Sequence, residues 1–152
     1  MHEIHEYLAT VETNYVDKIY SSYLMKIDST TKHPHAMSDG AYDSLFTFDK
    51  PIIFAFHGYP TLIHELTYYR HNRNIHVHGY QEEGTITTPF DMRVKNKIDR
   101  FHLVIDAVDN LNLGDIGVSI KNDMEAKLKK HQEYIVNNGI DMDEIRNWSF
   151  KD

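Results

Sequence analysis

The stretch PIIFAFHG, at residues 51–58, decides the fold of this chain. Residues 51–56 form a continuous apolar run, without the alternation of apolar and polar side chains that a strand with one solvent face shows. Such a run is typical of a strand that is buried on both faces, as in a parallel sheet. Gly58 then permits a sharp turn, and Pro60 suits the first turn of a helix. We therefore expect a buried strand that leads into a helix over residues 60–70.

A second strand is expected soon after this helix, at Ile75–Tyr80. A strand, a helix and a strand in this order form a βαβ unit with parallel strands and a right-handed crossover. Ligands of open α/β sheets collect beyond the carboxyl ends of the strands. The turn-rich loop over residues 81–87 is therefore where a ligand is expected.

A helix start follows this loop. Thr88-Pro89-Phe90-Asp91 places a threonine at the N-cap and a proline in the first turn. The region after it carries one broad apolar stripe, at Ile98, Phe101, Leu103, Val104, Ile105, Ala107 and Val108. A stripe of this width indicates a well-buried helix.

The rest of the C-terminal half is also predicted to be helical. Asp115 is expected to cap a last long helix, and Gly139 is expected to end it in the left-handed conformation. Trp148 and Phe150 are expected to fold the tail back onto the body.

The N-terminal part predicts a helix over residues 2–18, a strand over residues 19–27 and a short helix from Ser38 or Asp39 to Phe46. The fold class is therefore α/β, with three layers: a small, mainly parallel sheet flanked by helices. Three strands are few for such a sheet, so part of a larger design is expected to be missing.

Composition narrows the function. The 152 residues fit one domain, and the formal charge of −7 argues against nucleic acid as a partner. No apolar run approaches the roughly 20 residues that span a bilayer, so no membrane partner is expected. The chain has no cysteine, which agrees with a cytoplasmic location.

Several segments, in a fixed order, carry a family resemblance. They are HPH at 33–35, SD at 38–39, DSLF at 43–46, KPIIFAFHGYP at 50–60, LIH at 62–64, GYQEEGTITTPFDM at 79–92, DRFHL at 99–103 and EIRNW at 144–148. Over residues 32–111 the chain resembles the C-terminal domain of phosphoketolases. The resemblance implies that residues 1–152 form a single domain of the transketolase C-terminal type.

The sequence departs from the family pattern in places. The family pattern has glycine at Ala36, arginine at His78 and threonine at Ile86. Residues 1–25 match poorly, and the first strand of the family's domain is expected to be absent. A truncated chain is one explanation, and a natural short product is another.

The resemblance implies a link to enzymes that use thiamine diphosphate and Mg²⁺. Phosphoketolases cleave xylulose 5-phosphate or fructose 6-phosphate with phosphate, as aldehyde-lyases of carbohydrate metabolism. In related enzymes two other domains hold the cofactor, and the C-terminal domain helps to build the assembly. We expect no catalytic, cofactor-binding or metal residue here, no cofactor bound by this chain and no activity of the chain alone. The expected partners are phosphoketolase catalytic domains or a second copy of this chain.

Histidines are the first candidates for chemistry of their own. His76 and His78 alternate on one strand and so share a face. Other side chains that could complete a metal set are His57, His64, Glu65, Glu82 and Glu83. No HExxH spacing occurs, so packing and hydrogen bonding explain these histidines better than a metal. His33 and His35, in a loop, are weaker candidates still.

An anion site is the second candidate. Thr85, Thr87 and Thr88 precede a helix, and His57 ends the neighbouring strand. Free backbone N–H groups at a helix start attract anions. Three acidic residues in the same segment, Glu82, Glu83 and Asp91, would repel them. A capped helix with a threonine-rich turn is the competing interpretation.

Acidic pairs are the third candidate. Glu82 and Glu83 are adjacent and face opposite ways, whereas Asp106 and Asp109 are expected to face solvent on a helix. The tyrosines at 59, 68, 69 and 80 suit a contact surface. Three hypotheses follow: an interaction domain with an exposed apolar patch, a regulatory anion- or nucleotide-binding module, and a metal-dependent enzyme.

Overall fold

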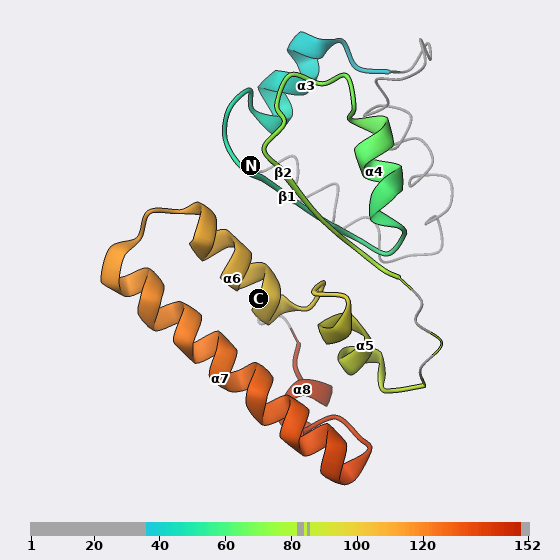
Figure 1. The fold of residues 1–152 in the computed structure, drawn as a ribbon, viewed down its shortest axis with the longest axis vertical. Coiled ribbons are helices and arrows are strands. Elements are labelled where there is room, and N and C mark those ends of the chain that lie inside the picture. The colour runs from blue at the N-terminus through green and yellow to red at the C-terminus, as the bar shows by residue number, and fades with distance from the viewer. Residues whose placement is uncertain (1–35, 82–83, 85, 150–152) are drawn as a thin grey trace. The chain divides into compact units, whose positions relative to one another are not determined.

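The computed structural model describes residues 36–81, 84 and 86–149 (Figure 1). The elements are, in order, α3 (Asp39–Phe46), β1 (Ile52–Phe56), α4 (Pro60–Leu66), β2 (Ile75–Gly79), α5 (Pro89–Lys95), α6 (Arg100–Asn110), α7 (Gly114–Asn138) and α8 (Asp143–Arg146). The α/β class is confirmed. The helix expected over residues 2–18, the strand over residues 19–27 and the missing first strand lie outside the described residues.

The strands β1 and β2 pair in parallel, with a register that runs from Ile52 opposite Ile75 to Phe56 opposite Gly79. Both predicted strands and their parallel pairing are confirmed. The prediction that β1 is buried on both faces is wrong for this sheet, because its residues are half-buried and Ala55 is exposed. In the described part of the chain the sheet has two strands.

Helix α4 ends earlier than predicted, at Leu66 rather than near residue 70. The amides of Tyr68 and Arg70 donate to carbonyls three residues back, which tightens the chain into turns. The Thr67 hydroxyl also donates to the Ile63 carbonyl at 2.7 Å. Side-chain bonds of this kind compete with regular helix geometry.

The described residues form two compact units. The first, called here the α3–α4 unit, contains the described residues up to Lys50 and Thr61–Asn74. The second, called the sheet–hairpin unit, contains Pro51–Pro60 and the described residues from Ile75 onward. Each unit is described below by itself.

The α3–α4 unit is built around Tyr42 and a buried arginine. Ser38 caps α3 by accepting a hydrogen bond from the amide of Ala41. The guanidinium of Arg70 lies over the Tyr42 ring, 4.5 Å from its centroid, and donates to Asp39 Oδ1 at 2.8 Å. Because Arg70 is only 2% exposed, the interior of this unit is partly polar.

Asn72 fixes the loop that follows α3. It is buried, and its Nδ2 donates to the carbonyls of Thr47 at 3.2 Å and of Lys50 at 2.7 Å. Its Oδ1 accepts from the amide of Asn74 at 2.9 Å. The Asn72 side chain therefore supplies the hydrogen bonds that these backbone carbonyls would otherwise accept from water.

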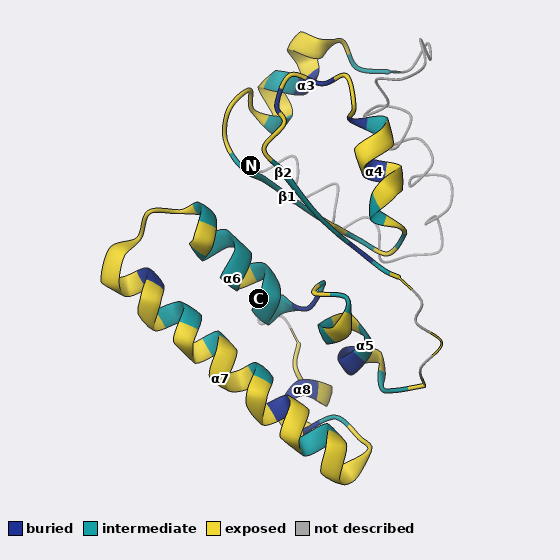
Figure 2. Cartoon of the chain, in the orientation of Figure 1, coloured by how far each residue is buried: buried dark blue, intermediate teal, exposed yellow. Residues whose placement is uncertain are grey.

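The sheet–hairpin unit contains a small apolar core of Phe90, Met142 and Ile145. The partly buried hydrophobic residues packed against this core are Val94, Phe101 and Tyr134. Helices α6 and α7 pack together, and α6 also contacts β1. Most of α7 is exposed, as Figure 2 shows, and only Gly117 and His131 on it are buried.

Helix caps follow local sequence in most places. Thr88 caps α5 and Pro89 begins it, as predicted, and Gly139 ends α7 with a φ of 68°. The expected cap at Asp115 is wrong, because α7 begins at Gly114 and its N-cap Leu113 makes no side-chain bond. Asp115 lies in the first turn instead, where its charge suits the helix dipole.

The apolar stripe from Ile98 to Val108 does not make a fully buried helix. Asp99 begins a separate helix, α6, by accepting hydrogen bonds from the amides of Phe101 and His102. No residue of α6 is fully buried, and Val104 is 37% exposed. The helix contacts α7 and β1, and these leave part of its stripe uncovered.

The tail folds back as predicted as far as Trp148, whose ring lies 4.6 Å from the Arg100 guanidinium. Burial lowers the pKa of Arg100, an effect that the nearby Asp99 opposes. Phe150 lies outside the described residues. None of the described helices combines the length and the apolar character that crossing a bilayer requires.

Candidate functional site

The carboxyl ends of the two parallel strands bring two ring side chains together. His57 directly follows β1 and Tyr80 directly follows β2. The amide of Tyr80 donates to the carbonyl of Gly58 at 2.9 Å. The two rings lie 4.7 Å apart between centroids and are tilted by 56°. Sequence reasoning pointed to this edge of the sheet and to His57, but not to Tyr80 as its neighbour.

Gly79 makes this close approach of the two strand ends sterically feasible. It is buried, and a Cβ atom there would lie 2.4 Å from the Gly58 carbonyl oxygen and 2.6 Å from Pro60 Cδ. Its backbone is ordinary extended strand, so space and not conformation excludes a side chain. The turn from β1 into α4 therefore lies directly across the end of β2.

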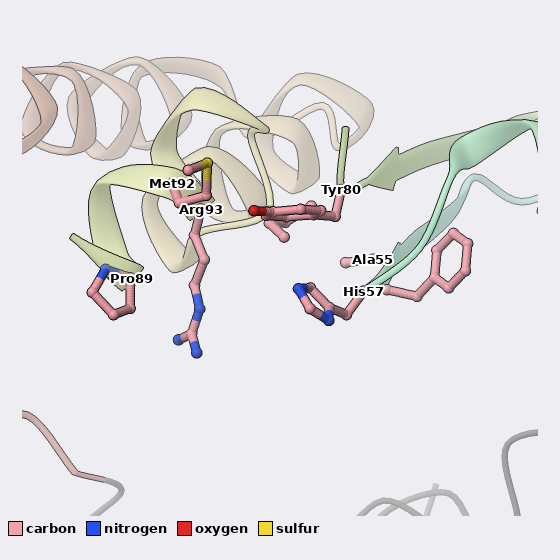
Figure 3. Close-up of a pocket in the computed structure, with 8 residues that line it drawn as sticks. Ala55, His57, Tyr80, Pro89, Met92 and Arg93 are labelled. Atoms are coloured by element: carbon pink, nitrogen blue, oxygen red, sulfur yellow. The ribbon is translucent and has the colours of Figure 1, made fainter. Parts of the chain in front are cut away.

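A cavity of about 490 Å³ opens beside these rings (Figure 3). Its polar lining consists of His57, Tyr80 and Arg93, and its apolar lining includes Phe56, Met92 and Ile98. In Figure 3, His57 and Arg93 extend from different elements to the same side of the Tyr80 ring. A cavity of this size, mostly apolar with a few polar groups, is typical of small-molecule sites.

Arg93 gives the cavity a positive charge. It lies in the last turn of α5, and its side chain is exposed. No carboxylate of the described residues forms an ion pair with it, and none lines the cavity. Its five N–H donors are therefore available to a ligand. The sequence offered no signal for this residue beyond its place in the helix after the loop.

The threonines of the predicted anion site have other partners. Thr87 Oγ1 donates to Asp91 Oδ2 at 2.6 Å, and Thr88 Oγ1 donates to Asp141 Oδ1 at 2.6 Å. Thr88 Oγ1 also accepts from the amide of Asp91 at 3.2 Å. Neither threonine lines the cavity, and Thr85 lies outside the described residues. Of the predicted set, His57 alone among the described residues lines the cavity.

A buried polar cluster stabilises the start of α5. Asp91 is buried and lies between Thr87 and His131, whose Nε2 is 3.3 Å from Asp91 Oδ1. The contact is not a well-aligned hydrogen bond, because neither ring nitrogen of His131 has a hydrogen-bond partner among the described residues. The Phe90 ring packs on the His131 ring at 5.1 Å. Sequence patterns do not reveal this histidine, which belongs to helix α7, far along the chain from Asp91.

The paired histidines of β2 share one carboxylate. His78 Nε2 lies 2.6 Å from Asp106 Oδ2, and His76 Nδ1 lies 3.3 Å from Asp106 Oδ1. Asn110 Nδ2 donates to Asp106 Oδ1 at 3.0 Å. The expectation that Asp106 faces solvent is wrong, because its side chain is 15% exposed and the histidines of the neighbouring strand surround it. The hydrogen bond of His78 to Asp106 agrees with the interpretation of these histidines as packing and hydrogen-bonding residues.

Asp109 faces solvent as predicted and pairs with Lys121 at 2.7 Å. The hydrogen bond to Asp109 raises the pKa of Lys121. His64 and Glu65 are exposed on α4, whereas His33, His35, Glu82 and Glu83 lie outside the described residues. Within the described ranges, no group of three His, Asp or Glu side chains is arranged to hold a metal ion.

A separate titratable pair lies in the α3–α4 unit. His71 Nδ1 lies 2.7 Å from Asp43 Oδ2. The hydrogen bond to Asp43, and then its charge, raise the pKa of His71. Both residues are close to solvent on one side, with His71 47% exposed, so this pair is a feature of the surface.

Comparison with known proteins places this geometry in a family. Residues 5–150 match the family described as XFP C-terminal domain. A probable phosphoketolase of Clostridium acetobutylicum is 52% identical over 148 residues, which cover 97% of this chain and 18% of that protein. A probable phosphoketolase of Rhodopirellula baltica is 56% identical over 129 residues, covering 84% of this chain and 16% of that protein. The chain thus spans less than a fifth of the length of these relatives, and it belongs to the family of phosphoketolase C-terminal domains.

Proposed function

We propose that this chain acts as the C-terminal structural and interaction domain of a thiamine diphosphate-dependent phosphoketolase, and that it is not catalytic alone. The observation that carries the proposal is the extent of the match, since 97% of this chain aligns with 18% of a probable phosphoketolase. In this proposal residues 1–152 form one three-layer domain of the transketolase C-terminal type. The domain works in the cytoplasm, beside the sugar phosphates that such an enzyme cleaves.

The described residues do not fit the cofactor. Thiamine diphosphate is held through a divalent ion, which needs several oxygen ligands. No such group of carboxylates occurs in the parts of the chain that the structure describes, and none of the described residues that line the cavity beside His57 is acidic. In the proposal, the cofactor and Mg²⁺ therefore belong to the other domains of the enzyme.

An exposed apolar surface supports an interaction role. The link between α6 and α7 and the start of α7 expose three aliphatic side chains, called here the hairpin tip: Leu111 at 55%, Leu113 at 41% and Ile116 at 71%. Clusters of exposed apolar side chains mark interaction sites more often than chance. We propose that the hairpin tip contacts the catalytic domains.

Two activity measurements test the proposal. The chain alone, folded by circular dichroism, is expected to form no acetyl phosphate from xylulose 5-phosphate and phosphate with thiamine diphosphate and Mg²⁺. A probable phosphoketolase that lacks its own C-terminal domain is expected to bind the added chain in analytical ultracentrifugation. Turnover by the chain alone would overturn the non-catalytic role, and the absence of any complex would overturn the interaction role.

A matched pair of variants locates the surface. Ile116→Lys is expected to weaken the complex at least tenfold, because it places a charge in the apolar contact. Val136→Lys makes the same kind of change on the same helix, at a residue that is 78% exposed, and is expected to leave binding unchanged. Equal weakening by both variants, or by neither, would exclude the hairpin tip as the contact.

A regulatory anion- or nucleotide-binding module is the second candidate function. For this candidate, the sequence predicts a site formed by Thr85, Thr87, Thr88 and His57. The observation that favours a ligand site is the cavity next to His57, which an arginine, Arg93, also lines. Saturable binding of a phosphate compound that Thr88→Ala weakens would support the threonine site.

A further inference from the structure

We propose that the cavity at the carboxyl edge of β1 and β2 binds a small organic phosphate, with Arg93 as the residue that holds the phosphate group. This inference deepens the second candidate function and does not depend on the interaction role. It assigns the site to Arg93, His57 and Tyr80 in place of the threonines.

The charge of the cavity selects an anion. Arg93 is the charged lining residue, and it has no ion pair within the described parts of the chain. Asp91, which would repel an anion, does not line the cavity and is already bonded to Thr87 and close to His131. Among the described residues, an anion that enters therefore meets one positive charge that no carboxylate compensates.

The number and kind of donors favour a phosphate over a carboxylate. The planar guanidinium offers two parallel N–H donors to an oxyanion. The His57 ring and the Tyr80 hydroxyl add donors from the ends of two different strands. Three donor side chains suit the three terminal oxygens of a phosphate monoester better than the two oxygens of a carboxylate.

The apolar part of the cavity lining favours a ligand that carries a carbon skeleton besides its phosphate group. Phe56, Met92 and Ile98 form an apolar wall beside the polar groups. A bare phosphate ion would leave this wall in contact with water, whereas an ester places its carbon skeleton there. The volume of about 490 Å³ is large enough for such a molecule.

The site is built on rigid parts of the fold. The hydrogen bond from Tyr80 to Gly58 and the contact of Gly79 with Pro60 fix the strand ends that carry His57 and Tyr80. Met92 and Arg93 lie on one helix, α5, whose start is capped by Thr88. The backbone that carries the three donors is therefore fixed, whereas the exposed Arg93 side chain loses rotamer freedom when it binds.

Phenyl phosphate is a suitable probe, because it combines one phosphate with one apolar ring. Titration of the full chain by calorimetry is expected to show one saturable site, at least tenfold tighter than for inorganic phosphate or for phenol. Equal affinity for inorganic phosphate would overturn the role of the apolar wall. Absence of saturable binding would overturn the whole inference and leave the interaction role untouched.

Arg93→Gln is expected to raise the Kd for phenyl phosphate at least tenfold, and Tyr80→Phe several-fold. Arg73→Gln is the matched control, since Arg73 is an exposed arginine of the α3–α4 unit, and it is expected to leave the Kd unchanged. An unchanged Kd in Arg93→Gln would overturn the assignment to this cavity. If Thr88→Ala then abolished binding, the second candidate function would stand with its threonine site.

Discussion

Both units of this molecule bury apolar and polar residues, but they arrange them differently. In the α3–α4 unit, three of the buried residues, Thr67, Arg70 and Asn72, are polar and bond to backbone carbonyls or to Asp39. In the sheet–hairpin unit, Phe90, Met142 and Ile145 form an apolar core. Figure 2 shows how few residues of either unit are fully buried.

The difference teaches how a domain with little interior can still be specific. An apolar core contributes free energy in proportion to the area it buries, about 25 cal/mol per Å². A buried polar side chain contributes less net energy, but each of its bonds fixes one loop in one geometry. Removing apolar volume should therefore lower stability most, whereas removing a polar side chain should release a particular loop.

The largest effect is expected from the apolar core. Phe90→Ala removes a ring that packs on Phe101 at 5.9 Å and on His131 at 5.1 Å. The free energy of unfolding should fall by about 3–5 kcal/mol, as for other large-to-small core changes. Urea denaturation measures it, and Val136→Ala, at an exposed site, should change it by less than about 0.5 kcal/mol. A loss for Phe90→Ala close to that of the control would show that the core is not what stabilises this unit.

The next effect tests the polar interior. Arg70→Met keeps a long apolar side chain but removes the bonds to Asp39 and the Met37 carbonyl. We expect a loss of about 2–3 kcal/mol, because bonds to charged groups contribute more than neutral ones. The same change at exposed Arg73 is the control and should cost less than about 1 kcal/mol. If Arg70→Met stabilised the chain, the result would show that apolar packing alone can stabilise the interior of both units.

A third comparison of the two units concerns the stability that one helix cap contributes in each. Thr88 caps α5 and also donates to Asp141, whereas Ser38 caps α3 through one bond of 3.3 Å at an exposed site. Thr88→Ala should cost about 1–2 kcal/mol and Ser38→Ala about 0.5–1 kcal/mol. Thermal unfolding of the two variants gives the order. A larger cost at Ser38 would contradict the view that the second bond of Thr88 adds stability.

The smallest effect is a pH dependence in the α3–α4 unit. Asp43 raises the folded-state pKa of His71 above its ordinary value, so the protonated ring is favoured in the folded state. The resulting stabilisation is complete below the unfolded pKa and is lost as the pH rises through the folded pKa. NMR titration should show a raised pKa for His71 that returns toward 6.5 in Asp43→Asn. A pKa of His71 that is the same in both proteins would refute the pairing.

Local chemistry explains which parts of the fold could be predicted. The apolar runs that became β1 and β2, the cap at Thr88 and the end of α7 at Gly139 all depend on residues adjacent in sequence. Partners that come from distant segments could not be predicted. Asp106 was assigned to solvent because helix spacing does not reveal that His78 lies opposite it on a strand.

The candidate site also contains some residues that the sequence could predict and some that it could not. Its location at the carboxyl edge of the sheet follows from topology, which sequence patterns revealed together with His57. Tyr80 could have been found by the same rule, since it directly follows the second strand. Arg93 could not, because only the folded chain shows that it lines the cavity and forms no ion pair with a described carboxylate. The threonines were misleading since their hydroxyls are bonded to Asp91 and Asp141.

Gly79 has a consequence for how this chain tolerates mutation. A single methyl group at this position would collide with the Gly58 carbonyl oxygen and the Pro60 ring. In a library with every amino acid at every position, residue 79 should accept glycine alone, and even alanine should be depleted. Neighbouring positions of β2 are half-buried and should accept several residues. The mutational profile of this strand would therefore show one sharply intolerant position at its end, caused by a turn from another part of the chain.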